Sequence, residues 1–210
     1  MKINNPLFIL GFLIIACACN NQQKESPTTN TTLPDSNTTT QNTPTPVHLI
    51  VDVSPMDMSY FPVDYPKIKM TNSNVAPPVM RVIYSRPHLE NRHLFKDLLK
   101  YNEPWRLGAN ESTEIEFYKS VSIQGKKIVP GRYILYCIPQ PQSWTIVLNS
   151  NVDTWGLHQD TAKDLQKFDI PVITDNPMQE YFTMVFEKTN KGADLIISWE
   201  NLLARLPVEF

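Results

Sequence analysis

Cysteine is scarce in this 210-residue chain, and its three cysteines are unevenly placed. Cys17 and Cys19 lie near the N-terminus, which leaves Cys137 alone in the rest of the chain. A single thiol can neither form an internal disulfide nor supply a cysteine-based metal site. We therefore expect Cys137, inside the apolar run RYILYCIP, to be a small buried hydrophobic side chain.

Glycine is scarce as well, with six residues in the whole chain. They form neither a P-loop nor a dinucleotide-binding pattern, and no G-x-S-x-G sequence is present. The four histidines include no H-E-x-x-H pair, so we predict no metal and no other cofactor. The net charge of −2, without a basic stripe in the sequence, argues against nucleic acid as a partner.

The N-terminus has the layout of a secretory signal, with a lysine, an apolar run and small residues beside a cysteine. The run from Leu7 to Ala16 is shorter than the roughly 20 residues that a membrane-spanning helix needs. The sequence IIAC resembles a bacterial lipobox, in which the cysteine is acylated and becomes the new N-terminus. We therefore predict a lipoprotein-type signal peptide over residues 1–19, with a lipid such as palmitate on Cys17. Acylation at Cys19, or an ordinary cleaved signal, is the alternative.

Residues 20–46 carry almost no apolar side chains. Such a segment cannot bury enough surface to offset its ordering entropy, so we expect a disordered polar tether. Residues 47–210 have the size of one domain with its own core. These features together predict an extracytoplasmic protein of the bacterial cell envelope. Its expected partner is a membrane, to which the N-terminal lipid anchor attaches it.

Short runs of β-branched and aromatic residues, separated by turn residues, dominate the domain. In STEIEFY, apolar residues alternate with glutamates, which is the pattern of a strand with one face in the core. RYILYCI is apolar on both faces and is expected to be central. The expected strands are 47–53, 79–85, 112–118, 132–138, 143–149, 180–187 and 193–199, with a hairpin of 121–123 and 127–129 about Gly125.

This regular spacing predicts an all-β fold, either an antiparallel sandwich or a barrel. Of these we expect a jelly-roll-like β-sandwich over residues 47–210, with one or two short helices. The first helix is expected over 88–101, because Pro87 suits a first turn and the apolar residues that follow can share a face. The second is expected over 158–168.

Arginines beside aromatic and turn residues are the most distinctive local feature. A guanidinium group matches carboxylate, phosphate and backbone carbonyl groups, and a tryptophan face suits sugars and rings. If the segments that carry these residues meet, they form a binding site for a small anionic or sugar-like ligand. Alternatively, the arginines bond to carbonyls or carboxylates at a buried corner. The candidate ligand-binding residues are Tyr84, Arg86, Arg92, Trp105, Arg106 and Asn110.

The sequence favours a non-catalytic binding or structural module, to which we assign no catalytic residue. The rival interpretation is a hydrolase-like enzyme that uses His88, His93 or Glu90 beside the arginines. An enzyme needs a base or nucleophile within hydrogen-bond reach of the pocket centre, whereas a binding protein needs only donors and a stacking face. Of the arginines, we expect Arg106 to be a buried strut, and Arg86 and Arg92 to be partly exposed.

Several motifs, in order along the chain, resemble the family catalogued as domain of unknown function number 2911. They are YSRP, R-x-x-F, WRLGANESTEIEF, GKKIVPGRYILYCIP, WTIVLN and WG. The resemblance runs from about Val79 to the end of the sequence. It implies a similar architecture and secretion, but no particular chemistry.

The chain departs from the usual motifs of this family at four positions. Asn91, Lys96 and Asn102 stand where glycine is usual, and Leu107 replaces a threonine. We expect the missing glycines to stiffen or reshape the segment 88–102. The missing threonine hydroxyl removes one hydrogen-bonding group from the candidate site.

Overall fold

The computed structural model describes residues 52–210. The predicted signal peptide, the acylated cysteine, the tether and most of the expected strand 47–53 lie outside the described residues. Residues 52 and 53 are not part of a strand, and the first strand of the described chain begins at Met56.

Residues 52–210 contain eleven β-strands, one α-helix, one π-helical turn and one 3₁₀ turn. The strands are β1 (Met56–Phe61), β2 (Met80–Ser85), β3 (Glu114–Phe117), β4 (Val121–Ile123), β5 (Lys126–Ile128), β6 (Gly131–Pro139), β7 (Ser143–Asn149), β8 (Asp164–Ile173), β9 (Gln179–Lys188), β10 (Gly192–Glu200) and β11 (Leu202–Glu209). The helical segments are α1 (Tyr65–Thr71), the π-helical turn Leu94–Leu98 and the 3₁₀ turn Thr161–Lys163.

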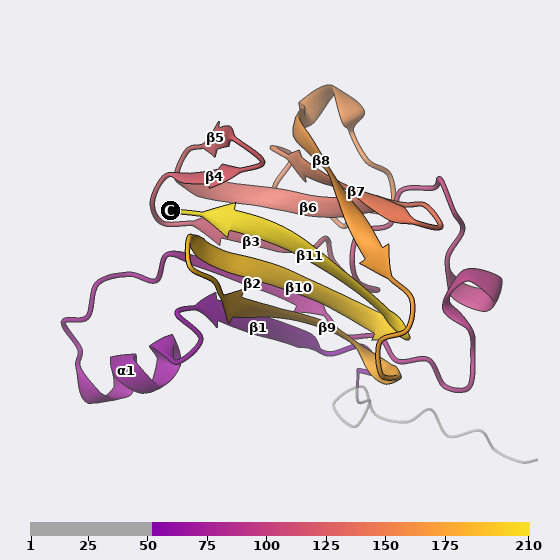
Figure 1. Cartoon of the computed structure of the whole chain (residues 1–210), viewed down its shortest axis with the longest axis horizontal. Helices are drawn as coiled ribbons and strands as arrows, with labels where there is room; N and C mark the ends of the chain where they lie inside the picture. The colour runs from indigo at the N-terminus through magenta and orange to yellow at the C-terminus, as the bar shows by residue number, and fades with distance from the viewer. Residues whose placement is uncertain (1–51) are drawn as a thin grey trace, which may run out of the picture. The chain divides into compact units, whose positions relative to one another are not determined.

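Most of the strands form one antiparallel hydrogen-bonded path, in the order β1-β2-β3-β6-β7-β8-β11-β10-β9. The β4–β5 hairpin joins this path through β4, where Ser122 lies opposite Glu209 of β11. The two end strands, β1 and β9, come together, because the Ser59 hydroxyl donates to the Met184 carbonyl at 2.7 Å. The sheet is thus nearly closed into a barrel (Figure 1).

The core lies between two facing layers of this sheet, with β9, β10 and β11 in front of β1, β2 and β3 in Figure 1. Tyr84 of β2 packs edge-on against Phe182 of β9, with ring centres 5.6 Å apart. Nearer the other end of the strands, Phe61 of β1 meets Phe186 of β9 at 6.4 Å. Alternate side chains of each strand point inward, which is why alternating runs of the sequence correspond to strands.

The structure confirms an antiparallel all-β fold, while the finer description as a jelly-roll-like sandwich stays a prediction. Every run expected to be a strand between residues 79 and 199 contains one, and the hairpin about Gly125 forms as β4 and β5. Strand β6 is central, between β3 and β7. Its Cys137 is fully buried, as expected, and burial raises the pKa of the thiol well above its ordinary value.

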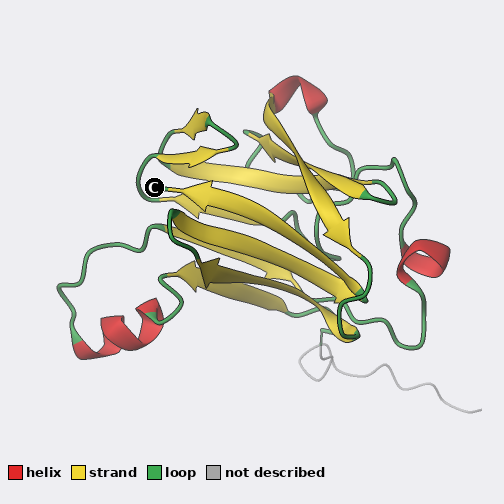
Figure 2. Ribbon diagram, in the orientation of Figure 1, coloured by secondary structure: helices red, strands yellow, loops and turns green. Residues whose placement is uncertain are grey.

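Both helix predictions are wrong over most of their length. The segment 88–101 contains only the π-helical turn, because its start pairs with β9: the Leu89 N–H donates to the Glu180 carbonyl at 3.0 Å. The segment 158–168 contains the 3₁₀ turn and the start of β8. The α-helix of the described chain, α1, was not expected and buries none of its side chains. Figure 2 shows α1 beyond one end of the sheet and the π-helical turn beyond the other.

Candidate functional site

The WRLGAN segment forms a corner that is fixed against β6. The Trp105 N–H donates to the Cys137 carbonyl at 2.7 Å, and the Cys137 N–H donates to the Trp105 carbonyl at 2.8 Å. Leu107 takes the positive φ of this corner, at 55°, although a glycine, Gly108, follows it directly. Gly108 is needed for close approach, since a Cβ there would lie 2.6 Å from the Ser85 hydroxyl oxygen.

Ser85, at the end of β2, holds the second half of the corner. Its buried hydroxyl oxygen accepts the Ala109 N–H at 2.7 Å and the Asn110 N–H at 3.1 Å. The Asn110 side-chain amide donates to Asp52 Oδ2 and to the Ser54 carbonyl, each at 2.8 Å. Asn110 therefore bridges the corner to the chain that leads into β1. Sequence reasoning missed Ser85, although the residue lies in the YSRP motif.

Two clefts open beside Trp105. The first, called the Arg106 cleft, has a volume of about 340 Å³ and is lined by Leu98, Leu99, Lys100, Glu103, Pro104, Trp105, Arg106, Gly108, Gly156 and Leu157. The second, called the His88 cleft, has a volume of about 310 Å³ and is lined by Val53, Ser54, Pro87, His88, Glu90, Arg92, Leu98, Leu99, Trp105, Gly108, Ala109 and Trp199. The corner thus brings Trp105 together with Arg106 in one cleft and with Arg92 in the other, whereas Tyr84, Arg86 and Asn110 line neither.

Trp105 belongs mainly to the core, with 5% of its surface exposed. Its ring lies nearly parallel to Trp199 at 5.9 Å and edge-on to Phe182 at 5.0 Å. The indole N–H donates to the Gly108 carbonyl at 3.1 Å. The tryptophan therefore offers the clefts an edge rather than the open stacking face that the sequence suggested.

Arg106 has an environment unlike that of the other arginines. Its guanidinium group donates to the carbonyl oxygens of Ala109 and Trp155, the latter at 3.5 Å, and it forms no ion pair with residues 52–210. Burial lowers the pKa of Arg106 below its ordinary value, and the nearby Glu111 opposes this shift only in part. An arginine nevertheless remains charged at neutral pH. The positive charge of Arg106 therefore faces its cleft without a paired carboxylate.

Arg86 lies outside the clefts and crosses the gap between the end strands. Its Nε donates to the Phe182 carbonyl at 3.2 Å, its Nη2 to Thr183 Oγ1 at 3.2 Å, and its Nη1 to Asp57 Oδ2 at 3.3 Å. The side chain is 35% exposed, as the sequence analysis expected of a partly exposed arginine. Its partners on β1 and β9 give Arg86 the role of a strut, which we had expected of Arg106.

The residues of the rival hydrolase hypothesis are divided by the structure. His88 Nε2 lies 3.2 Å from Glu90 Oε1, and both residues line the His88 cleft. Arg92 lines the same cleft, and its Nη2 lies 3.4 Å from Glu90 Oε2. His93 instead pairs with Glu200 at 2.9 Å, outside both clefts. Within residues 52–210, no group of three or more His, Cys, Asp or Glu side chains is placed to hold a metal ion.

Two departures from the family motifs preserve an unusual backbone conformation. Asn91 and Asn102, at positions where glycine is usual, have φ values of 63° and 64°. Asparagine enters this left-handed region more readily than most residues, because its short side chain can bond locally. These two substitutions are therefore compatible with the left-handed conformation that glycine adopts easily.

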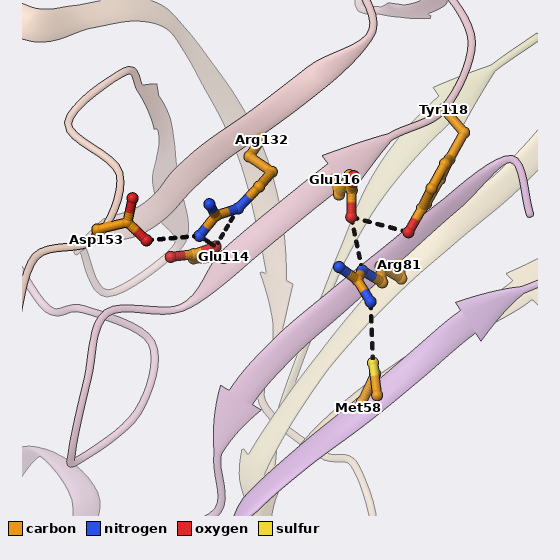
Figure 3. Close-up of polar contacts among 7 residues, drawn as sticks. All are labelled: Met58, Arg81, Glu114, Glu116, Tyr118, Arg132 and Asp153. Carbon is orange, nitrogen blue, oxygen red and sulfur yellow. Dashed lines mark hydrogen bonds and ion pairs between the residues drawn. The ribbon is translucent and has the colours of Figure 1, made fainter.

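A second polar cluster lies on the outer face of β2, β3 and β6 (Figure 3). Arg81 pairs with Glu116 at 2.7 Å, and Arg132 contacts Glu114 at 2.6 Å and Asp153 at 2.8 Å. Every charged group drawn in Figure 3 thus has an opposite charge beside it. Cross-strand pairs such as Arg81–Glu116 and Arg132–Glu114 stabilise a sheet, and they leave neither arginine without a carboxylate partner.

Tyr84, a candidate ligand residue, is buried, and its position makes the stability of the fold depend on alkaline pH. Burial raises the pKa of its hydroxyl to about 12, above the unfolded value of about 10. The neutral hydroxyl therefore stabilises the fold below pH 10, and this contribution is lost as the pH rises through 12. We therefore expect the contribution of Tyr84 to the free energy of unfolding to fall by about 1 kcal/mol between pH 10 and pH 11. Urea unfolding at both pH values measures the total loss, to which the raised pKa values of Tyr118, Tyr133 and Tyr136 also contribute. Tyr84→Phe should reduce this loss by about 1 kcal/mol, whereas Tyr101→Phe, at an exposed tyrosine, should leave it unchanged.

The geometry defines an all-β domain with paired clefts at one end, and comparison with known proteins gives its family. The family model described as "Protein of unknown function (DUF2911)" matches residues 66–208, so the chain belongs to this family. The match begins before Val79, where the motif resemblance started. No curated protein and no solved structure matches the chain. No helix in the described part of the chain is long and apolar enough to cross a membrane.

Proposed function

We propose that this protein is a lipid-anchored protein of the bacterial cell envelope whose barrel domain is a non-catalytic binding module. Its ligand is a small anionic or sugar-like molecule held in the Arg106 cleft. The signal-like layout of residues 1–19 and the lipobox-like sequence IIAC support the anchor, and the polar composition of residues 20–46 suits a tether between membrane and domain.

One observation carries the ligand proposal: among the arginines of residues 52–210, Arg106 is the one that forms no ion pair with a carboxylate of these residues. Arg81, Arg86, Arg92, Arg132 and Arg205 each form an ion pair with a carboxylate. Arg106 has only carbonyl partners and lies in a cleft large enough for a small molecule. An anion that enters the cleft gains a charge-assisted hydrogen bond from a guanidinium group that forms no ion pair within residues 52–210.

The rest of the Arg106 cleft suits a ligand with both charged and apolar parts. Lys100 adds a second positive charge, although it also lies 3.5 Å from Glu103. Leu98, Pro104 and Leu157 supply apolar surface, against which the non-polar face of a ring can pack.

Titration calorimetry on the detergent-solubilised full chain tests the proposal, with inorganic phosphate, glucuronate and N-acetylglucosamine as probes. We expect an anionic probe to bind, and Arg106→Ala to weaken that binding at least about tenfold, a loss of about 1.4 kcal/mol. Arg205→Ala removes an arginine that already has carboxylate partners, so it should leave the affinity unchanged.

The same Arg106→Ala variant separates a ligand site from a structural strut. Because the arginine loses only carbonyl partners, we expect its unfolding free energy to fall by about 1 kcal/mol. A loss of about 3–5 kcal/mol, the range for breaking a buried ion pair, together with no binding in the wild type, would identify Arg106 as a strut.

The hydrolase-like alternative rests on the contact of 3.2 Å between His88 and Glu90 in the neighbouring cleft. A histidine oriented by a carboxylate is an arrangement that general bases use. Turnover of ester or phosphoester substrates that disappears in His88→Gln would favour this enzyme over the binding module.

A further inference from the structure

Exposed lysines gather at the end of the barrel opposite the clefts. The sequence spreads them widely, over α1, the β3–β4 turn, β5 and the end of β9. We call this surface the lysine end, defined by Lys67, Lys69, Lys119, Lys126, Lys127 and Lys188.

Contacts around Phe210 show that the end of β1, the β3–β4 turn and the β9–β10 turn meet at this end. Phe61, at the end of β1 that leads to α1, packs against Phe210 with ring centres 5.4 Å apart. Lys119 Nζ lies 4.5 Å from the centre of the same Phe210 ring. The Phe210 N–H donates to the Lys191 carbonyl at 3.1 Å, which places the β9–β10 turn beside them. Figure 1 shows α1, the β4–β5 hairpin and the C-terminus on the same side of the barrel.

The charge of this surface is not neutralised by its own carboxylates. Within the described chain, none of the six lysines forms an ion pair, whereas Lys100, Lys163 and Lys167 elsewhere each do. The nearby Glu187 and Glu209 are themselves paired, with Arg205 and Lys191. Asp64 is the one other acidic residue in segments 62–73, 119–130 and 186–192, which leaves the lysine end strongly positive.

Exposed apolar side chains lie among these lysines. Val63 and Met70, on either side of the α1 lysines, are 63% and 87% exposed, and Val129 and Phe210 are also exposed. Lysines mixed with exposed apolar residues are typical of surfaces that bind the headgroup region of anionic membranes.

We propose that the lysine end docks on the anionic lipid surface of the membrane to which the protein is tethered. This inference rests on the proposed lipid anchor, which holds the domain close to that surface. The positive charge selects an acidic bilayer, and the apolar side chains of α1 enter its headgroup layer. Docking turns the two clefts away from the membrane, because β1 and β2, each about 20 Å long, separate the two ends.

Lysine acetylation footprinting tests this orientation on the full wild-type chain. The protein is reconstituted into phosphatidylglycerol vesicles or neutral phosphatidylcholine vesicles, labelled with an amine-reactive reagent, and each lysine is quantified by mass spectrometry. In acidic vesicles we expect labelling of Lys67, Lys69 and Lys119 to fall at least about threefold. Lys96 and Lys100, beside the clefts, serve as internal controls and should label equally in both. Salt at 1 M should abolish the difference in labelling between the two kinds of vesicle, because it reduces the electrostatic screening length to about 3 Å.

Matched charge reversals show whether the surface itself is responsible. Lys67→Glu combined with Lys69→Glu should restore the labelling of Lys119 and Lys188 in acidic vesicles, whereas Lys96→Glu combined with Lys100→Glu should not. Equal labelling of the lysine end in both kinds of vesicle overturns docking on lipid. Protection that appears only after a protein extract is added also overturns it, and identifies a protein partner instead.

Flotation of the same vesicles separates failure of docking from failure of the anchor. Wild-type chain that floats with the neutral phosphatidylcholine vesicles, while Cys17→Ser combined with Cys19→Ser does not, supports the anchor independently of the footprint. Wild-type chain that stays at the bottom of the gradient overturns both the anchor and the docking that depends on it.

Discussion

Replacing Trp105 by alanine is expected to lower the free energy of unfolding by about 3–5 kcal/mol. The side chain is buried between Trp199, Trp144 and Phe182, so its removal leaves a cavity that the neighbouring rings cannot fill. The variant also loses the hydrogen bond from the indole to the Gly108 carbonyl, which helps to shape both clefts. Guanidinium chloride unfolding measures the loss.

Trp155→Ala is the matched control, because this tryptophan lies near the Arg106 cleft but is 53% exposed. Its replacement should change stability by no more than about 0.5 kcal/mol. If Trp105→Ala were as stable as Trp155→Ala, the tryptophan would be a ligand wall, as the sequence suggested, rather than part of the core.

Arg86→Ala is expected to cost about 2 kcal/mol of stability, because a cation that joins three partners is lost. Two of these partners, the Phe182 carbonyl and the Thr183 hydroxyl, belong to β9, whereas Asp57 belongs to β1. Those strands are the two ends of the sheet. We therefore also expect Arg86→Ala to speed amide hydrogen exchange in β1 and β9, relative to the wild type, more than it does in β6 and β7. Hydrogen exchange followed by mass spectrometry resolves these segments.

Arg92→Ala is the control for Arg86→Ala. Arg92 is also partly exposed and has an ion pair, but its carbonyl partners, in Leu89 and His88, lie within a few residues of it. It therefore joins no distant strands, and its loss should leave the exchange of β1 unchanged. Equal effects of the two variants on β1 would contradict the strut role of Arg86.

The strands of this protein could be located from the sequence where apolar and polar residues alternate and one face of the strand is buried. The runs that became β2, β3, β6, β7, β9 and β10 contain enough β-branched and aromatic residues for their strands to be located. No strand was expected over Leu202–Glu209, where β11 forms and where Pro207 interrupts the apolar alternation. The structure tolerates this proline because it lies between the part of β11 that pairs with β8 and the part that pairs with β4.

The segment HQDTAKDLQKF illustrates the limit of local reasoning. Residues 158–160 belong to no helix or strand, and Thr161–Lys163 form a 3₁₀ turn. The rest becomes β8, because Asn149 and Leu148 of β7 pair with Asp164 and Gln166. Helix propensity in such a polar segment amounts to a fraction of a kcal/mol per residue, which strand pairing with a buried neighbour can override.

The sequence by itself determined which kinds of side chain were available: arginines at strand ends, a few histidines, and lysines without a basic stripe. It also determined most strands, because alternation is a property of neighbouring residues. Only the tertiary structure decided that Arg106 forms no ion pair within residues 52–210, whereas Arg86 has partners on both sides of the gap between β1 and β9. It also decided that distant lysines share one end of the barrel. The physical reason is that ion pairing and surface charge depend on distances of a few ångströms, and these are set by strand order and register between residues far apart in the chain.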